Sequence, residues 1–483
     1  MKRAIKMWYG KFQEYLYTYF FVSLLFAVPM MLSGQGVSDT NFSGVVGSGA
    51  RAFGMGGAFI AVADDATAAS WNPGGLGQLE RPEISFVLRG QRYREMTPAS
   101  NGLDFNSSLV GFTGAKDRKG NSYGIDFISF TYPVRIGTFK LVPQISYQRA
   151  ISYHLETRTN NVLNDGIIAN PGDQLYYYFQ GYSTDTEKFS GGIDTVTLSL
   201  GTKLFKRFNI GVSANFWVNG FTGRNTQSMA GKITPVQTLA ETDQGLISRS
   251  GDISVDVRGM TLNFGILVDV LENLKIGVVY KSSASTRVDY KGSHRIDMNV
   301  GGVPFTTGDE TYGDSTEISW PETWGFGISY RPIDTLTFSL DYTSTDWSQT
   351  VIRDFDHPYY GKYDEVYFPS FIPGYYQYGD IVIEGKQLDT QQLRFGVEYV
   401  LINKKVLFPL RMGFFTDSQY FPDASGGKIT FFGLTAGMGI KVGAIAIDGA
   451  MVYESGNYLR YNEDFSATRY ADFKFYVSTI YSF

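Results

Sequence analysis

The sequence lacks several features that would point to a soluble enzyme or a helical membrane protein. It has no cysteine, which excludes disulfides, thiolate metal sites, cysteine nucleophiles and lipid attachment at an N-terminal cysteine. Charged residues make up 18% of its 483 residues, against roughly 25% in ordinary globular proteins. After residue 36, no apolar run approaches the roughly 20 residues that a membrane-spanning helix needs. The mature chain is therefore either soluble or crosses a membrane as strands.

Histidine and charge clusters are scarce as well. His154, His294 and His357 lie far apart, and neither a metal-ligand spacing nor a catalytic triad surrounds them. The net charge of -5 is small and mixed in sign. We therefore expect no catalytic residue, no metal site, no cofactor, no enzymatic activity and no nucleic-acid partner.

The residues that are abundant favour strands and turns. The chain contains 55 Gly, 33 Tyr and 37 Phe, a mixture typical of β-structure with many turns. At the N-terminus, basic residues at positions 2 to 11 precede an apolar stretch at 19–32, and small residues follow at 33–36. This order is that of a cleavable secretory signal peptide rather than of a buried helix or membrane anchor, so we expect export and cleavage near Gly34 to Gly36.

Strict alternation of apolar and polar residues runs through the rest of the chain. It continues across pairs of strands joined by short turns, and the clearest pairs span 195–219, 262–280, 324–342, 393–414 and 432–453. The turns lie around Lys206, Glu272, Asp334, Asn403 and Gly443. A soluble β-sandwich would show similar alternation, so the pattern alone does not decide between the two.

Three further features favour a membrane barrel. Short turns alternate with long polar or aromatic connections at roughly 155–190, 226–250, 292–316 and 350–390, as expected for periplasmic turns and extracellular loops. Tyrosines that could form an interfacial girdle lie toward strand ends, at Tyr330, Tyr342, Tyr399 and Tyr453. The last strand carries Tyr481 and the terminal Phe483 on its apolar face, which suits lipid and is similar to the signal read by the outer-membrane barrel assembly machinery.

Counting strands from the residues gives about 15, starting near Glu83. Bacterial single-chain barrels have even numbers of strands, so one candidate must be wrong or must belong to a plug. The segments 83–93, 105–115 and 121–135 are the least secure. We expect an all-β, transmembrane antiparallel β-barrel in residues 83–483, after a signal peptide in 1–36 and an N-terminal hatch, or plug, in 37–82.

Residues 47–76 are rich in Gly and Ala and have too few large apolar side chains to form a core of their own. We therefore expect them to pack against a barrel wall. Their sequence resembles that of the FadL/TodX outer-membrane transport family in Arg51-Ala52, Gly54 to Ala58, Ala63-Asp64-Asp65-Ala66 and Asn72-Pro73 with Gly75-Leu76. Gly74 stands where the family usually has alanine, and the match covers about 30 residues.

This resemblance implies a barrel of 14 strands with a hatch in its lumen. It also implies passive uptake of hydrophobic small molecules, such as long-chain fatty acids or aromatic hydrocarbons, with lateral exit at a kinked strand. In family terms the hatch and gating residues are Arg51, Gly56, Gly57, Asp64, Asp65, Asn72 and Pro73. The expected partners are a hydrophobic ligand, outer-membrane lipids and the barrel assembly machinery, and we expect a monomer in the outer membrane.

Some of these residues have alternative interpretations. Gly47, Gly49 and Ala52 match a nucleotide-binding pattern, but no strand precedes them, so close packing is favoured. Asp64-Asp65 could bind a cation, although no third ligand lies at a suitable spacing, and hydrogen bonding within the plug is favoured. Asn72-Pro73 ends any preceding helix and marks the part of the hatch expected to move.

The connection from Phe355 to Tyr378 is crowded with aromatic residues. Exposed to water it would form a costly apolar patch, so it either captures ligand or packs at the lipid interface. The candidate capture residues are Tyr367, Phe368, Phe371, Tyr375 and Tyr376. Two other functions stay open: a shuttle or assembly role like that of hatch-bearing barrels in type IX secretion, which bind protein cargo, and a structural or adhesive surface barrel.

Overall fold

The computed structural model describes residues 47–97, 116–152, 155–169, 176–219, 225–238, 246–300, 303–306, 310–354, 375–378, 381–383, 388–422, 427–459 and 467–483. The signal peptide, the first residues of the predicted hatch and the candidate strand at 105–115 lie outside these residues. No helix in the described residues is long and apolar enough to cross a membrane.

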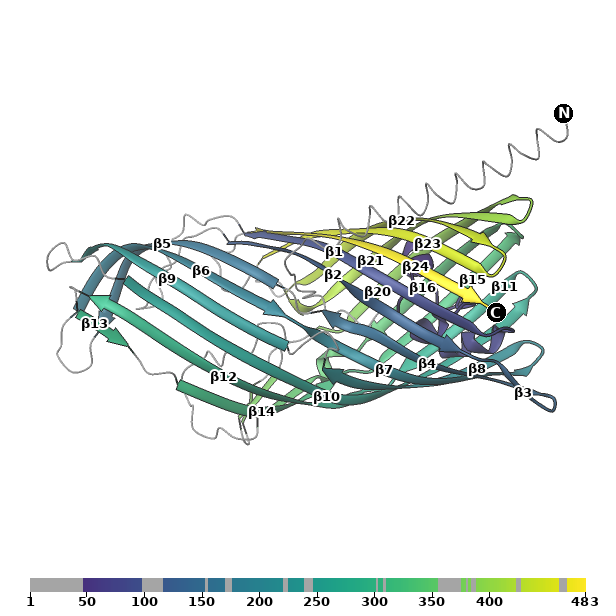
Figure 1. Ribbon diagram of the computed structural model, residues 1–483, viewed down its shortest axis with the longest axis horizontal. Coiled ribbons are helices and arrows are strands. Elements are labelled where there is room, and N and C mark those ends of the chain that lie inside the picture. The colour runs from purple at the N-terminus through teal and green to yellow at the C-terminus, as the bar shows by residue number, and fades with distance from the viewer. Residues whose placement is uncertain are drawn as a thin grey trace, which may run out of the picture.

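The described strands form a closed antiparallel barrel with a wall of fourteen strands (Figure 1). These strands are β1 (Glu83–Thr97), β2 (Lys116–Thr131), β4 (Phe139–Ser152), β7 (Gly192–Phe205), β8 (Phe208–Asn219), β10 (Leu246–Leu271), β11 (Leu274–Lys281), β15 (Thr323–Ile333), β16 (Leu336–Thr345), β20 (Thr390–Asn403), β21 (Val406–Pro422), β22 (Lys428–Val442), β23 (Ile445–Leu459) and β24 (Ala467–Ser482). β1 pairs with β24, from Glu83 opposite Ser482 to Met96 opposite Arg469, and this closes the barrel. The predicted fold class is confirmed.

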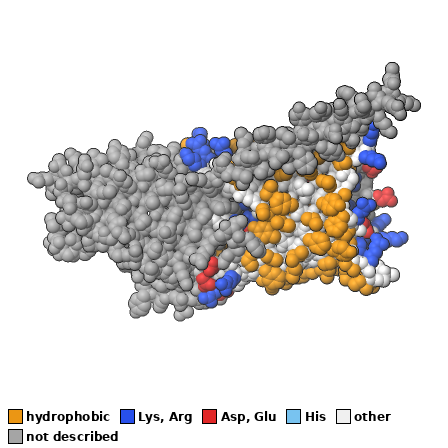
Figure 2. All heavy atoms as spheres, in the orientation of Figure 1, with side chains coloured by type: hydrophobic (Ala, Val, Ile, Leu, Met, Phe, Trp, Pro, Cys, Tyr) orange, Lys and Arg blue, Asp and Glu red, His pale blue; other side chains and the backbone are white. Residues whose placement is uncertain are grey.

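Alternation gives the wall an apolar outer face and a polar inner face. In β16, Leu340 faces outward and is 43% exposed, whereas Ser339 and Asp341 face inward and are buried. Exposed large apolar side chains occur on each of the fourteen wall strands, and Figure 2 shows them on one face as a band toward the end that carries the short turns. A continuous exposed apolar belt is stable only against lipid.

The C-terminal residues belong to this belt. The Tyr481 and Phe483 rings are stacked with their centroids 5.7 Å apart, and both side chains are about half exposed. The Phe483 backbone N–H donates to the Pro82 carbonyl at 3.0 Å, which joins the end of the chain to the start of β1. The first and last strands of the wall therefore meet where the barrel closes.

The predicted short turns are confirmed, but the prediction of long polar connections at 155–190, 226–250 and 292–316 is wrong. These stretches contain β5 (Leu155–Ala169), β6 (Tyr176–Ser190), β9 (Asn225–Thr238), β12 (Ala284–Val300), β13 (Val303–Thr306) and β14 (Glu310–Trp320). They extend the sheet beyond the apolar belt, at the left of Figure 1. Neighbouring strands pair their backbones, so a strand here needs no apolar face, and β5 and β6 show no sustained alternation that would reveal them.

The ladder between β2 and β4 is interrupted. β2 pairs with β4 at residues 127–131 and with β5 at residues 116–119; among the described residues, 120–126 pair with neither strand. Bulges flank this interruption, because the β1–β2 register skips Asp126 and the β4–β7 register skips Ala150. Bulges bend strands and end pairing, so we call this break the β2–β4 gap. β3 (Val134–Ile136) forms a hairpin with the first residues of β4, at the short-turn end of the barrel.

Short elements complete the fold. They are α2 (Ala50–Gly54), α3 (Ala68–Trp71) and η1 (Pro73–Gln78) before the wall, and η2 (Trp347–Gln349), β17 (Val351–Asp354), β18 (Tyr375–Tyr378) and β19 (Ile381–Ile383) after β16. β17 pairs with β14 and, in parallel, with β18. Part of the expected 350–390 connection is therefore also strand.

Candidate functional site: the hatch seat and two cavities

Residues 47–82, here called the hatch segment, lie inside the short-turn end of the barrel, where Figure 1 shows them in purple. The segment has a small core of its own, contrary to the expectation from its composition. Phe59 and Trp71 pack edge-to-face at 6.0 Å, surrounded by Met55, Leu76 and alanines. Trp71 Nε1 also donates to the Ser48 carbonyl at 2.7 Å, which ties the two ends of the segment together.

A ring of glycines on the wall receives the hatch segment. Within the described residues, eight wall strands place nine glycines where an added Cβ would come within 3.0 Å of hatch atoms: Gly201, Gly211, Gly265, Gly277, Gly325, Gly327, Gly396, Gly413 and Gly437. Gly413 in β21 faces Gly56, and Gly396 in β20 faces Met55. Only a residue without a side chain lets two backbones come so close. We call this ring, which runs over β7, β8, β10, β11, β15, β20, β21 and β22, the glycine seat.

Asn72 and Pro73 lie in the middle of this seat. Asn72 is fully buried, and its side-chain amide donates to the carbonyls of Ile60 at 2.9 Å and Ile266 at 3.0 Å. Its side-chain oxygen accepts from the Gly74 N–H at 2.9 Å, which caps η1. Asn72 therefore links both halves of the hatch segment to β10, eleven residues before β1 begins.

A chain of charges, half-buried in the hatch segment and buried in the wall, joins the two. Arg51 Nε and Nη2 each lie 2.9 Å from an oxygen of Glu398 in β20, and Arg51 Nη1 lies 2.5 Å from Asp64. Glu398 also accepts from Arg411 Nε at 2.6 Å, and Arg411 reaches Asp448 in β23 at 2.6 Å. Each arginine therefore has a charge-assisted partner on two sides.

Burial and pairing act in opposite directions on the hatch charges. Burial by itself would lower the pKa of Arg51. The carboxylates of Asp64 and Glu398 raise this pKa by more than burial lowers it, so Arg51 stays charged. Burial raises the pKa of Asp65, and Arg51 offsets part of this. Asp65 Oδ1 accepts from the N–H and hydroxyl of Thr67. No cluster that could hold a metal ion occurs within the described part of the chain.

Two wall residues hold the backbone of the hatch segment. Asp341 in β16 is buried, and its Oδ2 accepts the N–H groups of Phe59 at 2.6 Å and Ile60 at 2.7 Å. Arg394 in β20 donates to the Gly56 carbonyl at 3.3 Å. β16, which has no glycine in the seat, thus contributes a carboxylate.

On the side of the β2–β4 gap, side chains of the wall rather than its backbone contact the hatch segment. Phe53 stacks on Tyr476 of β24 at 3.9 Å, and the Ser48 hydroxyl hydrogen-bonds to Asp126, the bulge residue of β2. The Ala66 carbonyl accepts from Ser129 and from Gln144, each at 2.9 Å. Side chains can change rotamer, so this side is the more deformable border of the hatch segment.

A cavity lies between the hatch segment and the gap. This gap cavity encloses about 750 Å³ of empty space, including the part open to solvent. Asp126, Gln148, Arg149 and Ala150 line it at the edge of the gap. Its wall also has apolar rings, from Phe53, Phe415 and Tyr476, and charged groups, from Arg89, Arg394, Asp417, Glu454 and Lys474.

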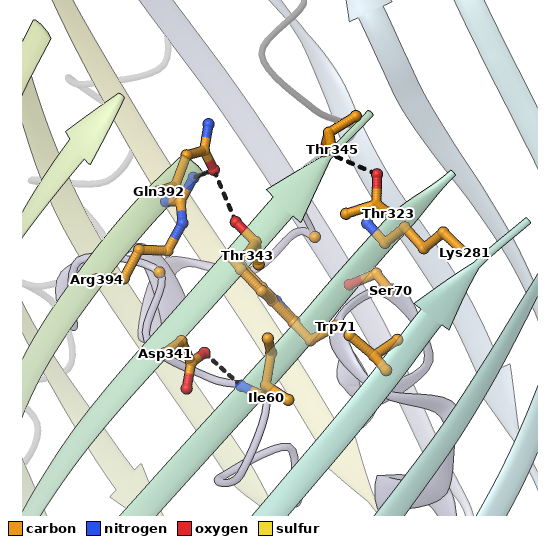
Figure 3. Close-up of a pocket in the computed structure, with 13 residues that line it drawn as sticks. Ile60, Ser70, Trp71, Lys281, Thr323, Asp341, Thr343, Thr345, Gln392 and Arg394 are labelled. Carbon is orange, nitrogen blue, oxygen red and sulfur yellow. Dashed lines mark hydrogen bonds between the residues drawn. The ribbon is translucent and has the colours of Figure 1, made fainter. Parts of the chain in front are cut away.

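A second cavity, the Trp71 cavity, lies over the opposite side of the hatch segment and has about 510 Å³ of empty space, including open solvent. Figure 3 shows Trp71 and Ile60 at its base and Lys281 and Arg394 on its walls. Gly47 and Arg394 line both cavities. The two cavities therefore adjoin at the start of the hatch segment and at Arg394.

The predicted hatch residues lie in or beside the glycine seat, whereas the capture role of the loop aromatics stays a prediction. Tyr367, Phe368 and Phe371 lie outside the described residues, and Tyr375 and Tyr376 belong to β18. Sequence reasoning missed the roles of Glu398, Asp341 and Arg394. The sequence could have pointed to them, because each is a charged residue among the inward-facing positions of a strand whose outward-facing positions are apolar.

Comparison with known proteins identifies the family. The model of the outer membrane protein transport family (OMPP1/FadL/TodX) matches residues 24–352. No curated protein matches the chain. Among solved structures, a Pseudomonas aeruginosa FadL homologue has a TM-score of 0.52 at 13% identity, covering 93% of this chain and 100% of that one. The P. putida toluene transporter TodX has a TM-score of 0.50 at 10% identity, covering 91% and 99%.

The family match confirms the resemblance seen in the hatch motifs, and the two structures support the barrel fold. Members of the family are channels for hydrophobic small molecules rather than enzymes. The apolar belt and the family agree on an outer-membrane location. This chain therefore belongs to the OMPP1/FadL/TodX family of outer-membrane transport proteins.

Proposed function

We propose that this protein takes up a hydrophobic small molecule passively and releases it sideways into the membrane through the β2–β4 gap. The observation that carries this proposal is the position of the gap cavity. The residues that line it, Asp126, Arg149 and Ala150, are those at which the β2–β4 ladder ends. A molecule in this cavity would lie next to residues 120–126, a stretch of β2 that pairs with neither β4 nor β5.

The glycine seat supports a path sideways into the membrane rather than through the lumen into the periplasm. Moving the hatch segment out of the lumen would break backbone-level contacts on eight strands and the Arg51–Glu398 pair. Sideways release requires changes only at Ser48–Asp126 and neighbouring side-chain contacts. An apolar molecule also gains free energy on entering lipid rather than the aqueous periplasm.

The lining of the gap cavity favours an amphipathic ligand. Phe53, Phe415 and Tyr476 offer an apolar surface, while Arg89, Arg149, Arg394 and Lys474 line the cavity as four cations against the three carboxylates of Asp126, Asp417 and Glu454. A molecule with a long apolar body and one carboxylate uses both kinds of group. We therefore favour long-chain fatty acids over the simple aromatic hydrocarbons, although similar structures are described as toluene and monoaromatic hydrocarbon channels.

Cross-linking the gap tests the route. Because the chain has no cysteine, Ile125→Cys with Ala150→Cys can be bridged by bismaleimides of graded length. Closing the gap should abolish uptake of labelled fatty acid by cells. The matched control bridges Ile276→Cys and Ile328→Cys, which are already paired across β11 and β15. Unchanged uptake in the gap cross-link, with the cross-link confirmed by mass spectrometry, would refute lateral release.

The same cells test the ligand class. Uptake of a long-chain fatty acid should exceed background, and uptake of toluene should be the weaker of the two. A shuttle or assembly role predicts instead that neither small molecule is taken up and that a large protein co-purifies with the barrel.

A further inference from the structure

We propose that a patch of arginines on the outer face of β1 and β24 binds the two phosphates of a glycolipid in the outer leaflet of the outer membrane. This basic patch consists of Arg92, Arg94 and Arg469, and it lies where the apolar belt ends on the side away from the short turns. The patch is on the lipid-facing surface, so its role does not depend on which molecule the barrel carries.

The alternation of side chains places all three guanidinium groups on the outer face. In β1, Arg92 and Arg94 are exposed on either side of the buried Tyr93. In β24, Arg469 is exposed next to the buried Tyr470. Because successive side chains of a strand point to opposite faces, the three arginines point away from the lumen.

The pairing of β1 with β24 brings the arginines together. Arg94 lies opposite Ala471 and Met96 lies opposite Arg469, so Arg94 and Arg469 are diagonal neighbours on one face. Such neighbours lie about 7–8 Å apart. Arg92 follows on the same face, two residues from Arg94. Like charges at this spacing repel each other, so an anion between them would stabilise the arrangement.

The outer face around the basic patch is positive. The carboxylates at this level of β1, β23 and β24, those of Glu95, Glu454 and Asp472, are buried on the inner face. Lys119 of β2 lies opposite Arg94 and is exposed, so it adds a fourth cation at the edge of the patch. Arg94 and Lys119 also interact with other groups of the chain, so the test below removes Arg92 and Arg469.

Aromatic rings lie directly beside the basic patch. Arg92 pairs with Phe473 across β1 and β24, and Phe473 pairs in turn with Tyr453 of β23. The ring centroids of Phe473 and Tyr453 lie 6.4 Å apart, and Tyr453 is 45% exposed. Outward aromatic rings mark the level of the lipid headgroups in barrels. A guanidinium group at that level can donate two parallel hydrogen bonds to one phosphate.

The length of the basic patch favours a headgroup with two phosphates. Arg92 and Arg469 lie four residue steps apart along the wall, because Met96 pairs with Arg469. This separation is roughly 13 Å for strands. One phosphate cannot contact both ends, whereas a disaccharide headgroup with a phosphate on each sugar can. The patch therefore fits a diphosphorylated glycolipid better than a phospholipid with one phosphate.

The outer face of β10 and β12 offers a matched comparison. Arg258 and Arg287 lie opposite each other there and are exposed. Asp289 lies 2.8 Å from Arg287, and Glu317 of β14 pairs with Arg287 across the ladder. Acidic neighbours offset these two arginines, so they should attract phosphate less strongly. Figure 2 shows a group of Lys and Arg side chains near β1, and near β14 a group in which they mix with Asp and Glu.

The test compares two double variants of the full-length protein in a mild detergent. R92Q/R469Q removes both ends of the basic patch, and R258Q/R287Q removes two exposed arginines elsewhere. Native mass spectrometry measures the binding of titrated diphosphoryl lipid A, monophosphoryl lipid A and phosphatidylglycerol. We expect wild type and R258Q/R287Q to bind diphosphoryl lipid A alike, and R92Q/R469Q to bind it about tenfold more weakly.

Further comparisons separate charge, headgroup and folding. R92K/R469K keeps the charge and should recover most of the binding, and heat-modifiable migration on gels checks that each barrel is folded. Wild type should bind monophosphoryl lipid A and phosphatidylglycerol more weakly than diphosphoryl lipid A. Equal binding of diphosphoryl lipid A by wild type and R92Q/R469Q would overturn the proposal, as would equal weakening in both glutamine variants. Phosphatidylglycerol binding as tight as that of diphosphoryl lipid A would overturn the assignment to a glycolipid.

Discussion

Arg51 of the hatch segment and Glu398 of β20 form a two-point ion pair, with both N···O distances at 2.9 Å. Glu398 is buried and is shared with Arg411, which is buried as well. One carboxylate thus neutralises a cation of the hatch segment and a cation of the wall. Removing Glu398 therefore affects two cations, whereas removing Arg51 leaves Glu398 with a cationic partner.

Replacing Glu398 should disturb hatch docking more than replacing Arg51. Glu398→Gln leaves Arg411 buried with only Asp448, and leaves Arg51 with only Asp64 and Asp65 of the hatch segment, a loss of about 3 kcal/mol. Arg51→Gln leaves Glu398 paired with Arg411, so its cost is smaller. Single-channel conductance in planar bilayers and protease sensitivity of the hatch segment report docking. Glu322→Gln, at the outer end of the wall, is the control, and equal conductance in wild type and Glu398→Gln would contradict the prediction.

A side chain in the glycine seat should displace the hatch segment. Gly413→Leu would place atoms where Gly56 lies, whereas nothing lies within 4 Å of a Cβ added at Gly449. We expect Gly413→Leu to raise ion conductance severalfold and to expose the hatch segment to protease, and Gly449→Leu to do neither. The idea of a backbone-level seat fails if both variants conduct alike.

Asp341 should matter through its acceptor oxygen. Asp341→Ala leaves the buried N–H groups of Phe59 and Ile60 without an acceptor, which costs about 1–3 kcal/mol for each. Asp341→Asn keeps one oxygen and should lose much less. Hydrogen exchange at these two amides, followed by mass spectrometry, should be fastest in the alanine variant. Similar exchange in the alanine and asparagine variants would show that the carboxylate does not hold the hatch segment.

The end of the hatch segment should loosen in acid. A hydrogen bond from Lys140, aided by Arg135, lowers the pKa of Glu80 below its ordinary value of 4.5. A lowered pKa means that this contact stabilises the folded state above about pH 4.5 and that the contribution is lost as pH falls through the lowered value. Glu80→Gln should therefore differ from wild type in hydrogen exchange of residues 79–83 at neutral pH, and the difference should vanish in acid. A difference that persists at low pH would exclude the ion pair as its cause.

Several features could be predicted from local sequence because their signals are short-range. Alternation along each strand identifies the lipid face, and Phe483 marks the closing strand. The Asn72-Pro73 and Asp64-Asp65 elements identify the hatch through family resemblance. By contrast, β5, β6 and β9 show no sustained apolar alternation, and their mutual backbone pairing makes them strands.

The sequence by itself determined that the chain is a barrel with an apolar outer face, because one residue in two must meet lipid. Only the tertiary structure decided where the hatch segment docks and where the wall is broken. Gly413 meets Gly56, and Asp126 meets Ser48, across hundreds or tens of residues of chain. Such contacts depend on how the closed barrel sets strands side by side, and no local pattern records that arrangement.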